Sequence, residues 1–234
     1  MPSGYCSLCG IYSNLTFEHI PPRSASNKST RYTEVPYLEF LKDNSKKPFK
    51  GKVQQGGTGF YSLCNKCNTF LGTKYVPSYT KLSTSLKDLI TREESNFKVV
   101  VHEFQPAKVL KQIAAMFISV NQSRFVDQHE DLKNYVRSPN SKVLPEHFRF
   151  FIYLNAEGHF RHLPMQIKGS VKKQNILASE ITFPPLGQVM TVGFKDDLPP
   201  LQEITYFKNF EIDQYASLEL NLEKLPTYIP LLLD

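Results

Sequence analysis

Four cysteines stand in two C-x-x-C pairs, Cys6 with Cys9 and Cys64 with Cys67, and the chain has no other cysteine. A C-x-x-C turn presents two thiolates to one ion, and zinc prefers tetrahedral sulfur and nitrogen ligands. Two pairs supply four ligands, which closes the coordination shell and leaves the ion a structural role. A redox C-x-x-C would come singly and near a βαβ pattern. The spacing therefore predicts a structural Zn²⁺ site that joins two distant segments.

Residues with different chemistry lie beside these cysteines. Glu18 and His19 directly precede Ile20-Pro21-Pro22, and Asn68 directly follows the last cysteine. A neutral imidazole can act as a base for water, and carboxylate and amide oxygens are the ligands that a hard cation prefers. Simpler interpretations stay open at each position: His19 as an ordinary loop histidine, Glu18 as a surface carboxylate, and Asn68 as a helix N-cap.

The order of three motifs is more specific than any one of them. CSLCG (6–10), EHIPP (18–22) and GGTGFYSLCNKCNTFLGTKY (56–75) together resemble the HNH (ββα-metal) endonuclease family with a C-x-x-C frame. The closest pattern is a subgroup with Glu-His-Ile-Pro-Pro and a Gly-Gly-x-Gly-x-Tyr-x-Leu-Cys-x-x-Cys-Asn ending. The resemblance covers residues 5 to about 79, a third of the chain.

This resemblance implies a metal-dependent endonuclease that hydrolyses phosphodiester bonds in DNA, with RNA as the other possible substrate. His19 would be the base, and Glu18 and Asn68 would hold a catalytic Mg²⁺ or Mn²⁺. It also implies a bacterial or phage context, including defence. Family members usually carry an asparagine that orients the histidine, and Gly59 stands in that position. Gln55, Tyr61 or a backbone carbonyl could substitute for it.

Two further departures concern the metal ligands: the acid is glutamate rather than the commoner aspartate, and the last histidine of the family is replaced by Asn68. The alternative function is therefore a catalytically degenerate zinc-ribbon module that binds nucleic acid or a protein partner. Gly59 is the residue that favours this alternative.

Charge is distributed unevenly along the chain. The formal net charge is +6, but residues 1–81 carry eleven Lys and Arg against four Asp and Glu, and the rest carry seventeen against eighteen. A basic segment favours a polyanionic partner such as DNA, because lysines and arginines that neutralise phosphates release counterions. Arg23 and Lys28 lie nearest to His19 in sequence and are the candidate phosphate contacts. The alternative interpretation of this basic segment is that its lysines are solvated loop residues.

Patterning predicts an α+β fold in two parts. Residues 1–80 would form a small zinc-bound ββα-metal module, with short strands at 15–17 and 60–63 and a helix over 68–75 that is interrupted at Gly72. Residues 37–41 could form a short helix, and 81–91 a helix or linker. Residues 81–234 would form an α+β domain with an antiparallel sheet, in which the clearest helix spans 106–120. Strands are predicted at 97–104, 148–154, 159–163, 180–183, 188–192 and 216–222.

The role of the second part is left open: substrate contacts, a protein partner, a homo-oligomer or regulation. His129 and His147 lie in it, without a partner that the sequence can assign. The chain has no run of 18 apolar residues, which argues against a membrane span, and its N-terminus lacks the features of a signal peptide. We therefore expect a cytoplasmic protein.

Overall fold

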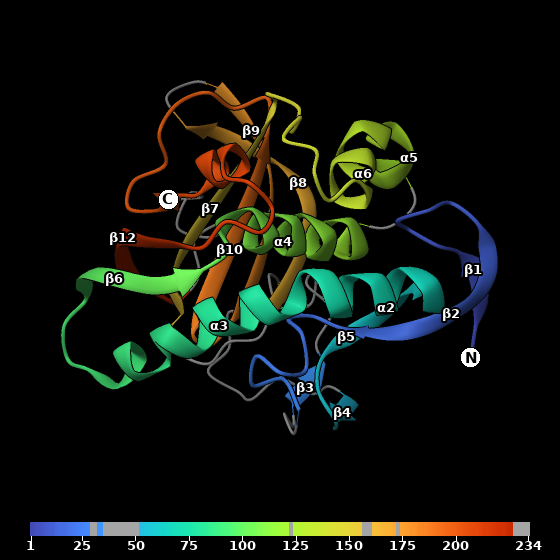
Figure 1. Ribbon diagram of the computed structural model, residues 1–234, viewed down its shortest axis with the longest axis horizontal. Coiled ribbons are helices and arrows are strands. Elements are labelled where there is room, and N and C mark those ends of the chain that lie inside the picture. Colours follow the sequence, from blue (N-terminus) through green and yellow to red (C-terminus); the bar gives the residue numbers. More distant parts are fainter. Residues whose placement is uncertain (29–31, 35–51, 122–123, 156–160, 172–173, 227–234) are drawn as a thin grey trace.

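The computed structural model covers residues 1–234, and the structure describes all of them except 29–31, 35–51, 122–123, 156–160, 172–173 and 227–234 (Figure 1). The helix considered for 37–41 lies outside the described residues. The fold is mixed α and β with mostly antiparallel sheets, in agreement with the predicted class. No helix in the described part of the chain is both long and apolar enough to cross a membrane.

The N-terminal region is built on a three-stranded antiparallel sheet in the order β1-β2-β5, followed directly by helix α2. Strand β2 continues through Glu18 and His19 rather than ending before them, because both pair with β5, opposite Phe60 and Gly59. A separate pair of short strands, β3 and β4, lies in the insertion between β2 and β5. The elements are β1 (Ser3–Tyr5), β2 (Tyr12–His19), β3 (Tyr32–Glu34), β4 (Lys52–Gln54), β5 (Gly59–Cys64) and α2 (Asn65–Lys74).

Helix α2 begins three residues earlier than predicted and is not interrupted at Gly72. A side chain at residue 72 would have open space around it, so this glycine marks neither a turn nor a close approach. The next helix also begins earlier than the predicted 81–91 segment, since Pro77 suits its first turn. These elements are α3 (Val76–Leu86) and a 3₁₀ turn (Lys87–Thr91).

The larger sheet has seven strands, in the order β6-β12-β7-β10-β9-β8 with β11 also paired to β7. Every pairing is antiparallel except the short β12–β7 contact. The predicted strands are found, mostly with longer bounds, and residues 159–160 of the strand predicted at 159–163 lie outside the described residues. The strands are β6 (Asn96–Phe104), β7 (Phe148–Asn155), β8 (Arg161–Val171), β9 (Gln174–Phe183), β10 (Leu186–Val192), β11 (Gln202–Glu203) and β12 (Ala216–Leu225).

Helix α4 (Pro106–Val120) has the predicted bounds and lies at the centre of the molecule. It crosses one face of the larger sheet, and α3 packs along it (Figure 1). Fourteen of its fifteen residues are buried, and these include three polar ones, Lys111, Gln112 and Ser119. Three shorter elements complete the chain: α5 (Arg124–Gln128), α6 (Glu130–Arg137) and a 3₁₀ turn (Thr205–Asn209).

One hydrophobic core runs through both parts of the chain. It includes Leu15 and Leu63 of the small sheet, Leu71 of α2, Phe117 of α4 and Phe150 of the larger sheet. Burial of such side chains stabilises a fold by about 25 cal/mol for each Å² removed from water. The division near residue 80 stays a prediction about domain organisation. What matters for the site is that α4 contacts the small sheet directly, through β5.

Candidate metal centre and adjoining cleft

The four cysteines come together at one end of the small sheet. Cys6 and Cys9 lie in the turn between β1 and β2, Cys64 ends β5, and Cys67 lies in the first turn of α2. The turn closes when the Gly10 N–H donates to the Cys6 carbonyl at 2.8 Å, with Gly10 at φ +73°. All four Sγ atoms lie within 4.8 Å of one another, and the Cys9–Cys64 pair is 3.9 Å apart.

These distances fit a metal ion rather than disulfides. A disulfide requires S–S of about 2.05 Å, and all four thiols are free. Zinc–sulfur bonds of about 2.3 Å place the corners of a tetrahedron about 3.8 Å apart, close to the Cys9–Cys64 separation. The cluster is therefore compatible with the predicted four-cysteine zinc site.

The pKa values of the cysteine thiols are also compatible with a bound metal ion. The pKa of Cys6 is lowered to about 4, chiefly because the Cys67 thiol hydrogen-bonds to it. The pKa of Cys67 is raised, first by that same hydrogen bond and then by burial, and burial raises the pKa of Cys9. One thiolate thus suppresses the ionisation of its neighbours. A divalent cation among the sulfurs would relieve this repulsion and allow more of them to ionise.

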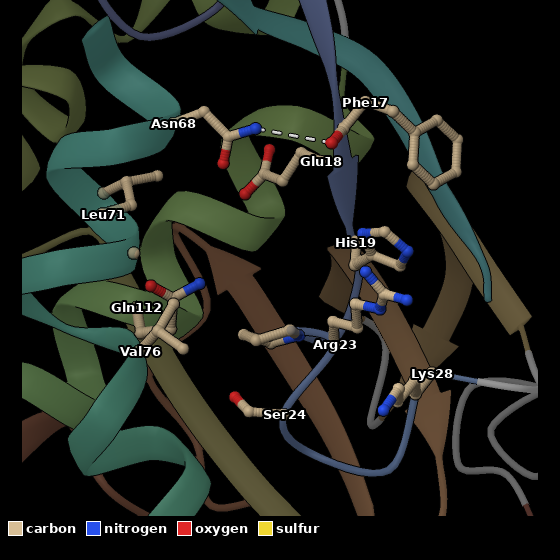
Figure 2. A pocket seen from close by; sticks show the side chains of 12 residues that line it. Phe17, Glu18, His19, Arg23, Ser24, Lys28, Asn68, Leu71, Val76 and Gln112 are labelled. Atoms are coloured by element: carbon tan, nitrogen blue, oxygen red, sulfur yellow. Dashed lines mark hydrogen bonds between the residues drawn. The ribbon is translucent and has the colours of Figure 1, made fainter. Parts of the chain in front are cut away.

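A cleft of about 580 Å³ lies at the other end of strands β2 and β5 (Figure 2). It brings together every residue that the sequence marked for chemistry or phosphate binding outside the cysteines. The catalytic and nucleic-acid roles assigned to these five residues stay predictions. They are Glu18 and His19 of β2, Arg23 and Lys28 of the following loop, and Asn68 of α2.

Glu18 is not a surface carboxylate, because only 4% of it is exposed. Its Oε2 accepts hydrogen bonds from Ser62 at 3.2 Å and from Ser119 of α4. Burial raises the pKa of Glu18 to about 7, although both hydroxyl contacts act in the opposite direction. The hydrogen bonds found within the described residues all reach Oε2, so Oε1 is left for the cleft that Glu18 lines.

Asn68 is not a helix N-cap, so that interpretation is wrong: α2 begins at Asn65 and its N-cap position is Cys64. The Asn68 amide nitrogen donates to Thr16 Oγ1 at 3.0 Å and to the Phe17 carbonyl at 3.4 Å. These contacts fix the side chain so that its oxygen points toward the Glu18 carboxylate in Figure 2. Two oxygen donors from different elements therefore line the cleft.

His19 follows Glu18 on β2, so its side chain leaves the opposite face of the strand. Its Nε2 lies 3.1 Å from the Gly56 carbonyl oxygen, and its ring meets Phe17 edge-on at 5.0 Å. Because a carbonyl oxygen only accepts, this hydrogen bond requires the proton on Nε2. The neutral ring then carries its free lone pair on Nδ1.

Gly59 cannot carry the orienting side chain in this fold. A Cβ at residue 59 would lie 1.9 Å from the Glu18 carbonyl oxygen, because β5 approaches β2 closely there. Of the substitutes considered, the one that contacts the imidazole is a backbone carbonyl, that of Gly56. The glycine is thus required by the strand pairing.

Asn27 holds the turn that presents this carbonyl. It is fully buried, and its amide nitrogen donates to the Pro21 carbonyl at 2.7 Å and the Thr58 carbonyl at 2.8 Å. Its oxygen accepts from the Thr58 N–H at 2.8 Å. Gly57, which lies between Gly56 and Thr58, adopts φ +101°, and a Cβ at this residue would lie 2.8 Å from His19 Cδ2. Asn27 therefore joins the loop after β2 to the turn before β5.

Arg23 and Lys28 are exposed at the rim of the cleft, and Figure 2 shows the Arg23 guanidinium beside His19. The larger sheet also reaches this region, where His162 of β8 contacts the Ile20 carbonyl through Nε2 at 2.9 Å. The loop that follows His19 is thus held from several sides.

Sequence reasoning missed Asn27 and Ser119, and it offered a backbone carbonyl as the partner of His19 without identifying Gly56. Ser119 is separated from Glu18 by 101 residues and lies in a helix that reads as apolar core. Asn27 sits in a loop rich in small polar residues, where no pattern distinguishes it. No family model, curated protein or solved structure matches this chain. Its function is therefore argued from the site itself.

Proposed function

We propose that this chain is a metal-dependent nuclease of the HNH type that hydrolyses phosphodiester bonds in DNA. The observation that supports it most is that Glu18, His19 and Asn68 line one cleft together with two exposed basic residues. These residues come from a strand, a helix and a loop, and their chemistry matches what phosphodiester hydrolysis needs: a base, oxygen ligands and phosphate contacts. The cysteine cluster would hold this arrangement from the far end of the strands.

His19 is the proposed general base. The hydrogen bond from Nε2 to the Gly56 carbonyl fixes the tautomer and the ring orientation. Nδ1 is then the atom that takes a proton from the attacking water. The carbonyl also stabilises the imidazolium that forms, because an N–H of the charged ring donates more strongly.

Glu18 Oε1 and Asn68 Oδ1 are the proposed ligands of Mg²⁺ or Mn²⁺, and their donor chemistry fits a hard cation. The bound ion would neutralise the scissile phosphate and stabilise the leaving oxygen. Ser62 and Ser119 hold the other oxygen of Glu18, which limits how far the carboxylate can rotate. Asn68 is held through its nitrogen, so that its oxygen stays available.

Charge around the cleft suits a polyanion. Within residues 1–28 and 55–87, Glu18 is the only acid, and it is buried. The exposed surface of these segments therefore carries basic side chains such as Arg23 and Lys28 without a nearby carboxylate from the same segments. Phosphates approaching His19 would meet attraction and no repulsion from this surface.

The alternative is a zinc-ribbon module that binds nucleic acid or a protein partner without cutting. Its support is no longer Gly59, because the Gly56 carbonyl contacts His19 instead. The burial of Glu18 favours it, since a carboxyl with a pKa near 7 and two hydroxyl partners can be a protonated structural group. The two functions differ in the role of Glu18 at neutral pH: it is an ionised metal ligand in the nuclease and a protonated structural group in the binding module.

A plasmid-cleavage assay tests the proposal. Supercoiled DNA is incubated with the full chain and Mg²⁺ or Mn²⁺, and the wild type is compared with His19→Ala and Glu18→Gln. We expect His19→Ala to reduce the cleavage rate about 10²–10⁴-fold, the contribution of a positioned base. Glu18→Gln keeps the shape and can still accept from both serines, but it removes the anionic ligand, so cleavage should also be lost.

His102→Ala is the matched control, because it removes an exposed histidine of β6 that has no place in the cleft. Cleavage that persists unchanged in both site variants would sink the mechanism. DNA binding by the wild type without cleavage would support the alternative. Single-stranded RNA in the same assay distinguishes the substrate class.

A further inference from the structure

Three side chains of metal-ligating type gather far along the chain from the cysteines and the cleft. His129 immediately precedes α6, Asp131 is the second residue of α6, and His147 immediately precedes β7. One ligand atom from each lies within 4.8 Å of the other two. Neither the cysteine cluster nor the proposed nuclease chemistry uses them.

Aromatic packing holds the two imidazoles in place. The ring of Phe148 meets the His129 ring at 5.0 Å and the His147 ring at 4.3 Å, so it lies against both. Phe125 of α5 covers His129 at 4.5 Å. The backbone at His147 is fixed as well, because its carbonyl accepts from the Gly193 N–H at 2.8 Å.

The carboxylate is also oriented. Oδ1 of Asp131 accepts from the Leu132 N–H at 2.8 Å, which leaves Oδ2 to face His147. Glu130, the neighbouring acid, is engaged with Lys133 and Arg137. Asp131 is therefore the anionic group of α6 that faces the two histidines.

The separations are too long for direct bonding but suit a shared ion. Oδ2 of Asp131 lies 3.8 Å from Nε2 of His147, beyond hydrogen-bond distance. Ligand bonds of about 2.1 Å to a tetrahedral ion place neighbouring donor atoms about 3.4 Å apart. Small side-chain rotations would therefore bring all three donors to one ion.

We propose that His129, Asp131 and His147 bind a divalent transition-metal ion of the zinc class, with water completing its coordination. Two imidazoles and one carboxylate suit Zn²⁺, Co²⁺ or Ni²⁺ better than Mg²⁺ or Ca²⁺, which favour all-oxygen shells. The ion would join the start of α6 to the start of β7. This site is independent of the nuclease proposal.

Metal binding to the full chain tests it. Protein already loaded with zinc at the cysteines is titrated with Zn²⁺ and, separately, with Co²⁺. We expect a second equivalent of metal to bind, with a visible Co²⁺ spectrum that lacks the charge-transfer bands of thiolate ligands. Asp131→Asn keeps an acceptor for the Leu132 N–H, so α6 should stay folded, and we expect it to weaken this second event by more than about tenfold. His147→Ala should abolish it.

Glu130→Gln is the matched control, since it removes the same charge one residue away on the same helix turn. It should leave the binding of the second metal equivalent unchanged. A wild type whose second equivalent binds no more tightly than about 1 mM would overturn the proposal. An Asp131→Asn variant that binds as well as the wild type would overturn it too. Because neither result involves DNA cleavage, the outcome is separate from that of the nuclease assay.

Discussion

Strands β2 and β5 carry the cysteine cluster toward one end and the candidate cleft at the other, and the two ends are held by different means. At the cysteine end, four thiols from two short motifs lie within 4.8 Å of one another. At the cleft end, Glu18, His19 and the following loop are held by Ser119 of α4, the Gly56 carbonyl, Asn27 and His162 of β8. One end is organised by two short cysteine motifs that lie 55 residues apart in the chain, and the other by single contacts from several separate segments.

This difference shows that a cluster of ligands and a reactive arrangement place different demands on a chain. Four similar donors can gather around one ion wherever two turns meet, since the ion itself supplies the attraction. A base and its partners require fixed orientations, which come from the groups packed behind them. Weakening each end in turn tests this difference.

Cys64→Ser should have the largest effect. Structural zinc sites contribute an apparent binding free energy of about 10–16 kcal/mol, comparable with or larger than the stability of a domain. We expect the variant to lose its metal and to unfold at β1, β2, β5 and the start of α2, while the larger sheet keeps its core. Elemental analysis and amide hydrogen exchange measure the two effects. Ser7→Ala, in the same turn as Cys6, is the control, and a metal-free but fully protected protein would contradict the prediction.

Gly59→Asn reinstates the residue that the resemblance would place beside the histidine. We expect it to destabilise the fold by about 3 kcal/mol or more and to abolish cleavage, because its Cβ would lie 1.9 Å from the Glu18 carbonyl oxygen. Thermal unfolding measures the loss. Gly72→Ala provides the contrast, since it has open space in a helix and should stabilise the protein by up to about 1 kcal/mol. A Gly59→Asn variant that folds and cleaves better would show that the Gly56 carbonyl does not orient His19.

The fold could be predicted from the sequence where local signals agree. The bounds of α4 follow from Pro106 at its first turn and from apolar residues at helical spacing, and the strands of the larger sheet follow from short aromatic or β-branched runs. The predicted start of α2 is three residues too late because a C-x-x-C pair is typical of a turn, whereas Cys67 lies in the first turn of the helix. A metal ligand within a helix has no local pattern that distinguishes it from one in a loop.

The site could be predicted only as far as its own motifs extend. Glu18 and His19 lie between the two cysteine pairs, and Asn68 directly follows the last cysteine. Their positions relative to the cysteine motifs make these three residues recognisable in the sequence. Ser119 and Asn27 belong to no motif, and their importance lies in contacts across 101 and 31 residues. Contacts between residues so far apart in the chain produce no pattern that can be recognised in a single sequence.

Asn27→Ala tests the cleft end next. The substitution leaves the Pro21 carbonyl and the Thr58 N–H buried without the Asn27 amide, which should cost about 2–3 kcal/mol, while the Thr58 carbonyl keeps its hydrogen bond from the Ile20 N–H. We also expect slower cleavage with unchanged DNA binding, because the Gly56 carbonyl would no longer be held against His19. Asn14→Ala is the control: Asn14 is exposed, and within the described residues its side chain hydrogen-bonds only to Ser3. Equal stability of the two variants would contradict the role given to Asn27.

Acidification should test the contact between the larger sheet and the loop after His19. Burial lowers the pKa of His162 from 6.5 to about 4, although the bond to the Ile20 carbonyl acts in the opposite direction. Between these values the unfolded chain binds a proton that the folded chain does not. The stability due to neutral His162 is therefore fully present above pH 6.5 and falls as the pH drops toward 4. Because the residue is partly exposed, we expect a total loss of about 2 kcal/mol, of which about half is reached by pH 5.

The measurement compares wild type and His162→Gln by chemical denaturation between pH 7 and pH 5. Glutamine can still donate to the Ile20 carbonyl but does not titrate, so the difference between the two slopes isolates His162. This subtraction is necessary because Glu18 acts with the opposite sign: its pKa is raised to about 7, so its contribution to stability grows as the pH falls. Glu18 and the cysteine cluster are present in both proteins and cancel. A wild type that loses no more stability than His162→Gln would mean that the sheet holds the loop without depending on a neutral imidazole.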